Sequence, residues 1–353
     1  FLNLFLFSFF LSMTIGTRVM GLIIPFLFIF FFSMENFNKK KINDSLTILI
    51  FLTFTITLTI IFWPFLWDNP FNILDSFSSM SKYDWKGSVY FNGNYYSGKY
   101  LPWYYLPMTI LITTPILYIV LFIFGFFYIT KQSLKNLLNI EKAQNLWSNK
   151  EELFCLYSMS IVLLTITLII ELNSTLYNGW RQVFFIYPSL IFVSIFGLNM
   201  IIKNFNFKKI IYLIIGLYLI FNFNWLYQNH PYQYTYYNSF VNNANIKKFE
   251  LDYWGLSNLD IMKKLNELEP NKKNYRIYVF SSSPYNFSLN LMNDSLSKKY
   301  MFVDNLDEAD YIFTNHFYQN KDPIIAEKYL KENFNLIFEI KLDNIRINSI
   351  YKK

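Results

Sequence analysis

The sequence has few of the residues on which most soluble enzymes and metal sites are built. Its 353 residues include one cysteine and two histidines, and only 16% are charged. A single cysteine, Cys155, excludes a disulfide within the chain and a metal cluster held by several cysteines. His230 and His316 are too far apart in the sequence to suggest a metal site. Glycine-rich phosphate loops, HExxH and GxSxG are also missing, so these soluble-enzyme motifs give no explanation of function.

The chain is instead rich in apolar and aromatic residues. They make up 54% and 22% of the chain, outside the usual range of soluble domains, and this composition predicts a polytopic membrane protein. The net charge of +7 comes with lysines grouped in short loops between apolar runs. Orientation in a membrane explains such loops, so we expect no nucleic-acid partner.

Seven apolar runs predict the membrane part of the fold. They are 1–15, 19–33, 46–63, 106–129, 153–170, 183–202 and 210–223. The basic loops 36–43, 131–150 and 203–209 are cytoplasmic by the positive-inside rule. Alternation then places 64–107, 171–182 and everything after residue 224 on the external face.

The remainder of the chain reads as soluble. Alternating and buried patterns predict helices at 259–268 and 324–332, and strands at 276–280, 311–314, 336–342 and 345–351. Strands interleaved with helices favour a small α/β domain. The predicted fold is therefore mostly α: a polytopic transmembrane helical bundle, 1–223, with an external loop at 64–105, followed by an external α/β domain, 224–353.

The external loop carries the first candidate residues. Lys99 is followed by Tyr100, Trp103 and Tyr104, just before the run 106–129. A lysine among phenols at headgroup level could bind a phosphate, with the rings packing on a sugar or lipid. The alternative is an aromatic belt with a solvated loop.

Two arginines at the ends of apolar runs are further candidates. Arg181, after Trp180, could hold a phosphate through two parallel hydrogen bonds at the external mouth of a span. The alternative for this pair is an interfacial anchor. Arg18 interrupts the first two runs, where it could meet an anionic partner or reach the headgroups as a helix-end residue.

A third polar element follows the last span. It combines 230–234, which begins with His230, and 249–255, which holds Glu250 and Asp252. Acidic and histidine side chains beside aromatic rings suit hydroxylated ligands. They also suit a structural collar that seats the soluble domain on the membrane, and we favour the collar.

Six segments together carry a resemblance. They are TRVMGLI (17–23), WPFLWDNP (63–70), KYLPWYYLP (99–107), YNGWRQVFFIYP (177–188), HPYQYTYYN (230–238) and FELDYWGLS (249–257). Their order and placement resemble bacterial membrane glycosyltransferases similar to the dolichyl-phosphate-mannose protein mannosyltransferase family, glycosyltransferase family 39 of the C-type superfamily. The resemblance covers about residues 17–257, and no single motif in it is specific.

The resemblance implies an enzyme of the bacterial inner membrane. Such an enzyme transfers a sugar from a polyprenyl-phosphate donor to a lipid, glycan or protein acceptor on the external face. The family uses an acidic residue of its first external loop as a general base or metal-associated group. Before the first basic loop the only acidic residue here is Glu35, so we expect the catalytic residue upstream of Phe1 and this chain to be the carboxyl-terminal part of a longer transferase.

External placement then suggests roles for the candidate residues. The donor phosphate is assigned to Arg181, Lys99 and Arg18, and the lipid or sugar groove to Tyr100, Trp103, Tyr104, Trp180 and His230. No metal ligand is assigned, and a divalent cation is left open as a cofactor. Two other readings stay open: a transporter or flippase of lipid-linked sugars, and a noncatalytic membrane-anchored binding protein.

Overall fold

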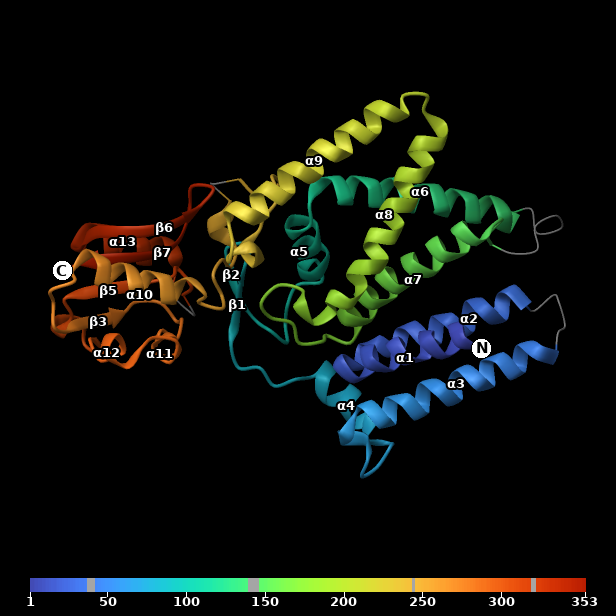
Figure 1. Ribbon diagram of the computed structural model, residues 1–353, viewed down its shortest axis with the longest axis horizontal. Coiled ribbons are helices and arrows are strands. Elements are labelled where there is room, and N and C mark those ends of the chain that lie inside the picture. The colour runs from blue at the N-terminus through green and yellow to red at the C-terminus, as the bar shows by residue number, and fades with distance from the viewer. Residues whose placement is uncertain (37–41, 139–145, 243–244, 319–321) are drawn as a thin grey trace. The chain divides into compact units, whose positions relative to one another are not determined.

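The computed structural model describes residues 1–36, 42–138, 146–242, 245–318 and 322–353 (Figure 1). The chain forms two compact units. We call Phe1–Trp85 with Lys99–Gly216 the helical unit, and Lys86–Gly98 with Leu217–Lys353 the C-terminal unit. A short piece of the loop between two apolar helices therefore belongs with the end of the chain.

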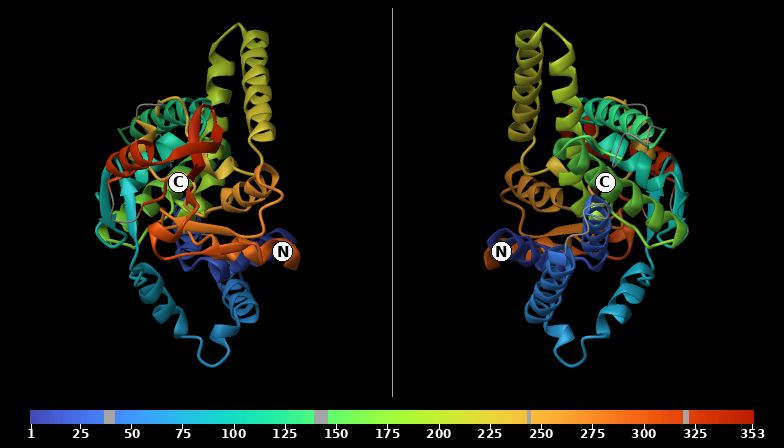
Figure 2. Two further views of the ribbon diagram at one scale, coloured as in Figure 1. Left: turned by 90° about the vertical axis from the view of Figure 1, so that its left-hand side faces the viewer. Right: turned by 90° about the vertical axis from the view of Figure 1, so that its right-hand side faces the viewer.

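The helical unit is built from α-helices joined by short 3-10 turns. In chain order they are α1 (Leu2–Thr17), η1 (Val19–Leu22), α2 (Ile23–Asn36), α3 (Ile42–Phe62), η2 (Pro64–Leu66), α4 (Asn72–Ser81), α5 (Tyr105–Thr113), α6 (Ile116–Leu138), α7 (Lys150–Glu171), η3 (Arg181–Ile186) and α8 (Tyr187–Asn204). Helix α9 (Lys208–Gln228) begins in this unit and continues into the C-terminal unit. Figure 2 shows the short connection that turns the chain from α8 into α9.

Within the described residues, five helical segments are long and apolar enough to cross a membrane. They are Ser45–Phe62, Ile116–Leu138, Lys150–Glu171, Arg181–Asn204 and Lys208–Gln228. The first two apolar runs form the shorter helices Leu2–Thr17 and Val19–Glu35. Length and composition thus indicate an integral membrane protein, and the predicted abundance of apolar helices is confirmed. Insertion as a seven-span bundle stays a prediction.

One expected span is divided. The run 106–129 forms the end of α5 and the start of α6, because the helix stops at Thr113 and Thr114 is extended, with φ −100° and ψ 138°. Pro115 explains the break, since a proline disfavours the helical conformation of the residue before it and has no N–H to donate. The prediction of one continuous span here is wrong.

Glycines allow two of the long helices to pack closely. A Cβ on Gly125 of α6 would lie 2.3 Å from the carbonyl oxygen of Val193, and a Cβ on Gly197 of α8 would lie 2.2 Å from that of Leu121. Small residues at such contacts let two helix backbones approach, the usual basis of helix association in lipid. Helices α6 and α8 are therefore a tightly fitted pair.

The C-terminal unit contains a five-stranded sheet in the order β4-β3-β5-β7-β6. Strands β4 (Tyr300–Phe302), β3 (Tyr275–Val279) and β5 (Tyr311–Thr314) are parallel, while β7 (Ile345–Lys352) runs antiparallel to β5 and to β6 (Asn335–Leu342). Its helices are α10 (Ser257–Leu268), α11 (Asn286–Leu289), α12 (Asp294–Ser297), α13 (Pro323–Asn333), η4 (Gln233–Thr235), η5 (Ile246–Lys248) and η6 (Leu306–Glu308). All four predicted strands and both predicted helices are confirmed within two residues, whereas β4 and the short helices were not foreseen.

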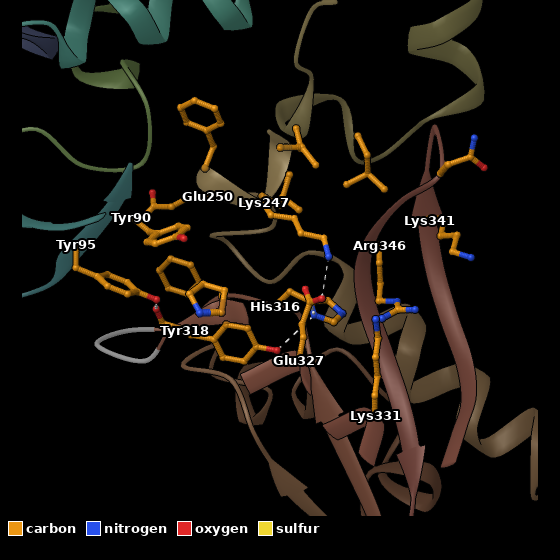
Figure 3. Close-up of a pocket in the computed structure, with 17 residues that line it drawn as sticks. Tyr90, Tyr95, Lys247, Glu250, His316, Tyr318, Glu327, Lys331, Lys341 and Arg346 are labelled. Carbon is orange, nitrogen blue, oxygen red and sulfur yellow. Dashed lines mark hydrogen bonds and ion pairs between the residues drawn. The ribbon is translucent and has the colours of Figure 1, made fainter. Parts of the chain in front are cut away.

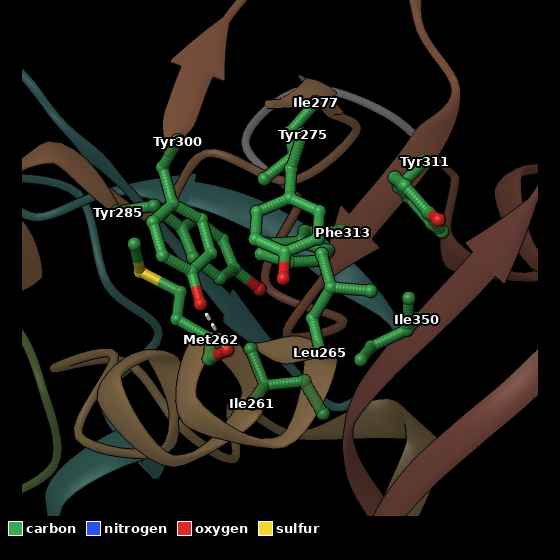
Figure 4. Close-up of a cluster of buried hydrophobic side chains, with 10 residues drawn as sticks. All are labelled: Ile261, Met262, Leu265, Tyr275, Ile277, Tyr285, Tyr300, Tyr311, Phe313 and Ile350. Atoms are coloured by element: carbon green, nitrogen blue, oxygen red, sulfur yellow. Dashed lines mark hydrogen bonds between the residues drawn. The ribbon is translucent and has the colours of Figure 1, made fainter. Parts of the chain in front are cut away.

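Alternation along the strands gives the sheet two covered faces. Tyr311 and Phe313 of β5 pack with Leu265 of α10 in a core of buried side chains (Figure 4). Ile312, between them, packs instead with Leu330 of α13. Because successive strand residues point to opposite faces, one strand serves both layers. The unit is a helix–sheet–helix sandwich, as expected of an α/β domain.

A β-hairpin from the interhelical loop joins this sandwich. Strands β1 (Ser88–Phe91) and β2 (Asn94–Ser97) are linked by Asn92 and Gly93, both with positive φ, 51° and 84°. Asn-Gly is the preferred pair for such a turn. The hairpin is held by a hydrogen bond from the Gly93 N–H to the Lys248 carbonyl, 3.0 Å, and by Phe91 against Phe249, 5.6 Å between ring centroids. The sequence analysis did not identify this hairpin.

Candidate functional site

Two of the predicted external segments meet in the helical unit. The ring of Tyr177 stacks on Trp85 with centroids 4.6 Å apart and lies 6.5 Å from that of Tyr83. The Thr175 hydroxyl also donates to the Tyr83 carbonyl, at 2.9 Å. We call Tyr83, Trp85 and Tyr177 the aromatic platform. It connects the loop after α4 with the loop after α7, which are 92 residues apart.

Arg181 belongs to this platform. It begins η3, its side chain is exposed, and its guanidinium carbon lies 4.7 Å from the centroid of the Tyr177 ring. Stacking on an aromatic face restrains a guanidinium while its edge stays able to donate to an oxyanion. The predicted phosphate-binding arginine is thus restrained next to an aromatic surface.

Lys99 is tied to the same platform through Asp84. The Lys99 ammonium lies 2.6 Å from the Asp84 carboxylate, and Asp84 sits between Tyr83 and Trp85 in the chain. The two side chains are 39% and 69% exposed. An exposed ion pair contributes only about 0.2–1 kcal/mol. Asp84 therefore neutralises Lys99 only weakly, and an anionic ligand could replace it as the partner of Lys99.

Trp180 is buried below the surface on which Arg181 lies. Its indole N–H donates to the Thr113 hydroxyl of α5 at 2.9 Å, and its ring contacts Phe184 with centroids 5.0 Å apart. The Tyr105 hydroxyl adds a hydrogen bond to the Gly179 carbonyl, 3.3 Å. The residue that the sequence assigned to the groove fixes α5 to the Arg181 segment.

The other predicted groove residues of the loop are on the surface. Tyr100 is 77% exposed and Trp103 is 70% exposed, while Tyr104 packs edge to face against Trp103 with centroids 5.8 Å apart. Large exposed aromatic rings at the ends of apolar helices suit contact with lipid headgroups or with sugars. Their exposure is compatible with a ligand-facing role.

Arg18 lies at the same end of the helical unit. It follows the last residue of α1 and lines a small cavity of about 50 Å³. Met80 of α4, Gln182 of η3 and Ser174, which precedes η3 in the chain, line the same cavity. Three of the predicted cations, Arg18, Lys99 and Arg181, therefore belong to segments that contact one another or share neighbours.

His230 lies in the C-terminal unit, unlike the other seven predicted site residues. It is exposed after α9, and its Nδ1 lies 2.9 Å from the Gln233 side-chain nitrogen. It is joined to Pro231 by a cis peptide bond. These contacts are local to the turn that leads away from α9.

The segment 249–255 folds into the interior of the C-terminal unit. Asp252 is fully buried and accepts hydrogen bonds from the Leu256 and Ser257 N–H groups, at 2.9 and 3.2 Å, and from the Tyr234 and Ser257 hydroxyls. Its carbonyl accepts from the Asn315 amide at 2.8 Å. A carboxylate with this many internal donors has little capacity left for a ligand. The burial favours a structural role for the FELDYWGLS segment.

Among the described residues, no group of three or more histidine, cysteine, aspartate or glutamate side chains could hold a metal ion. The aromatic platform itself was not recognised in the sequence. Tyr177 stood in one of the quoted segments, but its pairing with Trp85 is a long-range contact without a local pattern. No family model matches the chain, and neither a curated protein nor a solved structure matches it.

Proposed function

We propose that this chain is a membrane glycosyltransferase that uses a polyprenyl-phosphate sugar as its donor. The observation that carries the proposal is the aromatic platform with Arg181 stacked on it and Lys99 joined to it, next to apolar helices of membrane length. A donor of this class has an apolar tail, an anionic phosphate and a hydroxylated sugar. The proposed site provides a matching surface for each part.

The roles follow from this chemistry. Arg181 and Lys99 bind the phosphate, and Tyr100 and Trp103 contact the sugar or the first isoprene units. Transfer breaks the bond between the sugar C1 and the phosphate oxygen as the acceptor hydroxyl attacks C1, and polyprenyl phosphate leaves. Cations near the leaving phosphate favour this step because negative charge grows there in the transition state.

Acceptor activation needs a base that takes the hydroxyl proton. In the platform the nearest carboxylate in sequence is Asp84, which is engaged by Lys99. The proposal therefore assigns donor binding to these residues and leaves the base to a carboxylate outside the platform. The acceptor, a lipid, glycan or protein, is taken up at the external face of a bacterial inner membrane.

Donor binding gives the sharpest test. The full chain is placed in lipid nanodiscs and titrated with a polyprenyl-phosphate hexose, and with the neutral polyprenol as a reference. We expect Arg181→Ala to weaken donor binding about tenfold or more, since a hydrogen bond to a charged group contributes about 1.5–3 kcal/mol. Arg181→Lys should recover only part of the loss, because lysine lacks the planar fork.

Lys203→Ala is the matched control. Lys203 ends α8 and pairs with Glu151 at 3.1 Å, away from the platform residues, so its loss should leave donor affinity unchanged. Equal binding of the phosphorylated donor and of the neutral polyprenol would contradict the proposal. Equal effects of Arg181→Ala and Lys203→Ala would do the same.

One observation favours a second function, transport of a lipid-linked sugar. The apolar segment at α5 and α6 is interrupted at Thr114 and Pro115, and broken apolar helices are common at transporter binding sites. Donor labelled in the sugar separates the two functions. Transfer separates the label from the polyprenyl phosphate, whereas transport moves the intact molecule across the bilayer.

A further inference from the structure

The C-terminal unit contains a cavity of about 280 Å³ that neither the family resemblance nor the transferase proposal uses. Figure 3 shows Tyr90 and Tyr95 on one side of it and Lys331 and Arg346 on the other. The volume is close to the lower limit of small-molecule sites, roughly 300 Å³. The cavity therefore suits one small ligand with two chemically different ends.

The cationic side carries more positive than negative charge. Lys247 pairs with Glu327 at 3.2 Å, and Arg346 pairs through its Nε with Glu339. Lys331 has no acidic partner in the part of the chain that the structure describes, and it lines the same side of the cavity as Arg346 (Figure 3). Lys331 and Arg346, with Glu339 pairing only the latter, give this side of the cavity a surplus of positive charge that suits an anion.

A buried histidine, His316, lies in the wall of the cavity close to these charges. His316 Nε2 lies 2.9 Å from the Ser349 hydroxyl, and the imidazole is 5% exposed. The pKa of His316 is lowered to about 3, chiefly by burial and then by the positive charges of Arg346, Lys247 and Lys331. The imidazole is therefore neutral at physiological pH, so its 3.8 Å approach to Glu327 is not an ion pair. Its two ring nitrogens lie near the Ser349 and Tyr318 hydroxyls, so the neutral ring completes the wall of the cavity without adding charge to it.

The opposite side offers rings and a carboxyl group. Tyr90 and Tyr95 of the hairpin have ring centroids 4.7 Å apart, and the Tyr95 hydroxyl donates to the Tyr318 carbonyl. Glu250 accepts the Tyr90 N–H at 2.9 Å, and burial raises the pKa of Glu250 to about 7. Near neutral pH this carboxyl group can accept or donate a hydrogen bond. Aromatic faces with such a group suit a hydroxylated ring.

We propose that this cavity binds an anionic saccharide, with its phosphate or carboxylate against Lys331 and Arg346 and its ring against Tyr90 and Tyr95. All of these residues belong to one unit, so the site stands independently of the transferase proposal. The hairpin then has a function beyond docking, because it brings the ring-binding side of the cavity from a distant part of the chain.

The test measures binding to the full chain in nanodiscs, without polyprenyl donor, by isothermal titration calorimetry. The probes are a hexose phosphate, a hexuronate, the neutral hexose and inorganic phosphate. We expect an anionic sugar to bind at least tenfold more tightly than the neutral hexose and than inorganic phosphate. The tighter of the two anionic sugars identifies the source of the negative charge, and either supports the proposal.

Two lysines of α13 give a matched pair of variants. Lys331→Ala should weaken binding of the anionic sugar about fivefold or more, and Lys331→Glu should abolish it. Lys328→Ala should have no effect, because Lys328 is 73% exposed, lies beside Glu332 and is outside the cavity lining. A thermal melt of each variant confirms that it is folded.

Three results would overturn the proposal. In the first, neutral and anionic sugars bind equally, which would show that Lys331 and Arg346 do not bind the anionic group. In the second, inorganic phosphate binds as tightly as the hexose phosphate, which removes the saccharide. In the third, Lys331→Ala and Lys328→Ala have the same effect. None of these measurements depends on Arg181 or on a lipid donor, so this proposal and the transferase proposal fail separately.

Discussion

The two units place their apolar side chains in opposite ways. In the five apolar segments of membrane length, between 0% and 39% of the residues are buried within the protein, and α9 has no buried residue. In the C-terminal unit a single core buries Tyr275 and Ile277 of β3, Tyr311 and Phe313 of β5, and Ile261, Met262 and Leu265 of α10. Hydrophobicity in the first case suits a lipid solvent, and in the second it drives the packing of a sheet.

Polar side chains differ between the units in the same sense. In the helical unit several hydroxyls bond within their own helix, as Thr59 does to the Thr55 carbonyl at 2.7 Å and Thr109 to the Tyr105 carbonyl at 2.6 Å, while Ser194 of α8 also reaches the Tyr118 carbonyl of the neighbouring α6 at 2.9 Å. In the C-terminal unit, Asn348 bonds to Ser257, 91 residues away, at 2.8 Å. A hydroxyl that hydrogen-bonds within its own helix leaves no unpaired polar group facing lipid. A hydrogen bond between residues far apart in the sequence helps to specify one tertiary fold.

The largest expected effect tests this difference in burial. Ile277 of β3 is fully buried, so Ile277→Ala should lower the free energy of unfolding of the C-terminal unit by about 2–5 kcal/mol. Leu213 of α9 is 61% exposed, and Leu213→Ala should change stability in the same detergent by less than about 0.5 kcal/mol. Urea unfolding followed by pulsed proteolysis measures both. Similar losses would show that α9 is packed against protein.

A smaller effect is expected where the helical unit does depend on close packing. Gly197→Val should destabilise the contact of α8 with α6 by about 1–3 kcal/mol or more, because its Cβ has no room beside Leu121. Gly216→Val in α9 is the control, since nothing lies within 4 Å of a Cβ at that position. Thermal unfolding in detergent compares them. If both variants melt like the unaltered chain, then α6 and α8 do not pack through these glycines.

Most helices and strands that were predicted correctly have a local pattern in the sequence. Apolar runs predicted the long helices, and a short run of apolar residues predicted the buried strand β5 with its observed bounds, Tyr311–Thr314. Two features that the predicted elements left out also have local signals: Pro115, a possible break in the run 106–129, marks the end of the helix before α6, and Asn92-Gly93 marks the β1–β2 turn. Their meaning was lost because a long apolar run and an aromatic loop suggested simpler structures.

Long-range contacts could not be read in the same way. Tyr90 bonds to Glu250 across 160 residues, and Tyr95 bonds to Tyr318 across 223. No spacing in one sequence indicates such pairs, so the cavity of the C-terminal unit was not predicted. The candidate phosphate site was partly foreseen: Lys99 and Arg181 were chosen for their charge and placement, but the platform that connects them was not.

The smallest expected effect concerns pH and belongs to the C-terminal unit alone. Burial depresses the pKa of His316 from 6.5 to about 3, so the unfolded chain binds the extra proton and acidification below about 6.5 destabilises the fold. Burial raises the pKa of Glu250 from 4.5 to about 7, so the folded chain binds the extra proton and acidification toward 4.5 stabilises the fold. Between pH 4.5 and 6.5 the two effects oppose each other.

The free energy of unfolding should therefore change little across that window in the unaltered chain. Each variant removes one side of the balance, and one proton corresponds to about 1.4 kcal/mol per pH unit. His316→Gln should gain stability as the pH falls from 6.5 to 4.5, and Glu250→Gln should lose it. Urea unfolding of the C-terminal unit at several pH values gives the slopes. Equal slopes in the two variants would show that neither group is buried as the structure has it, whereas slopes of opposite sign would locate both titrations inside this unit and outside the apolar helices.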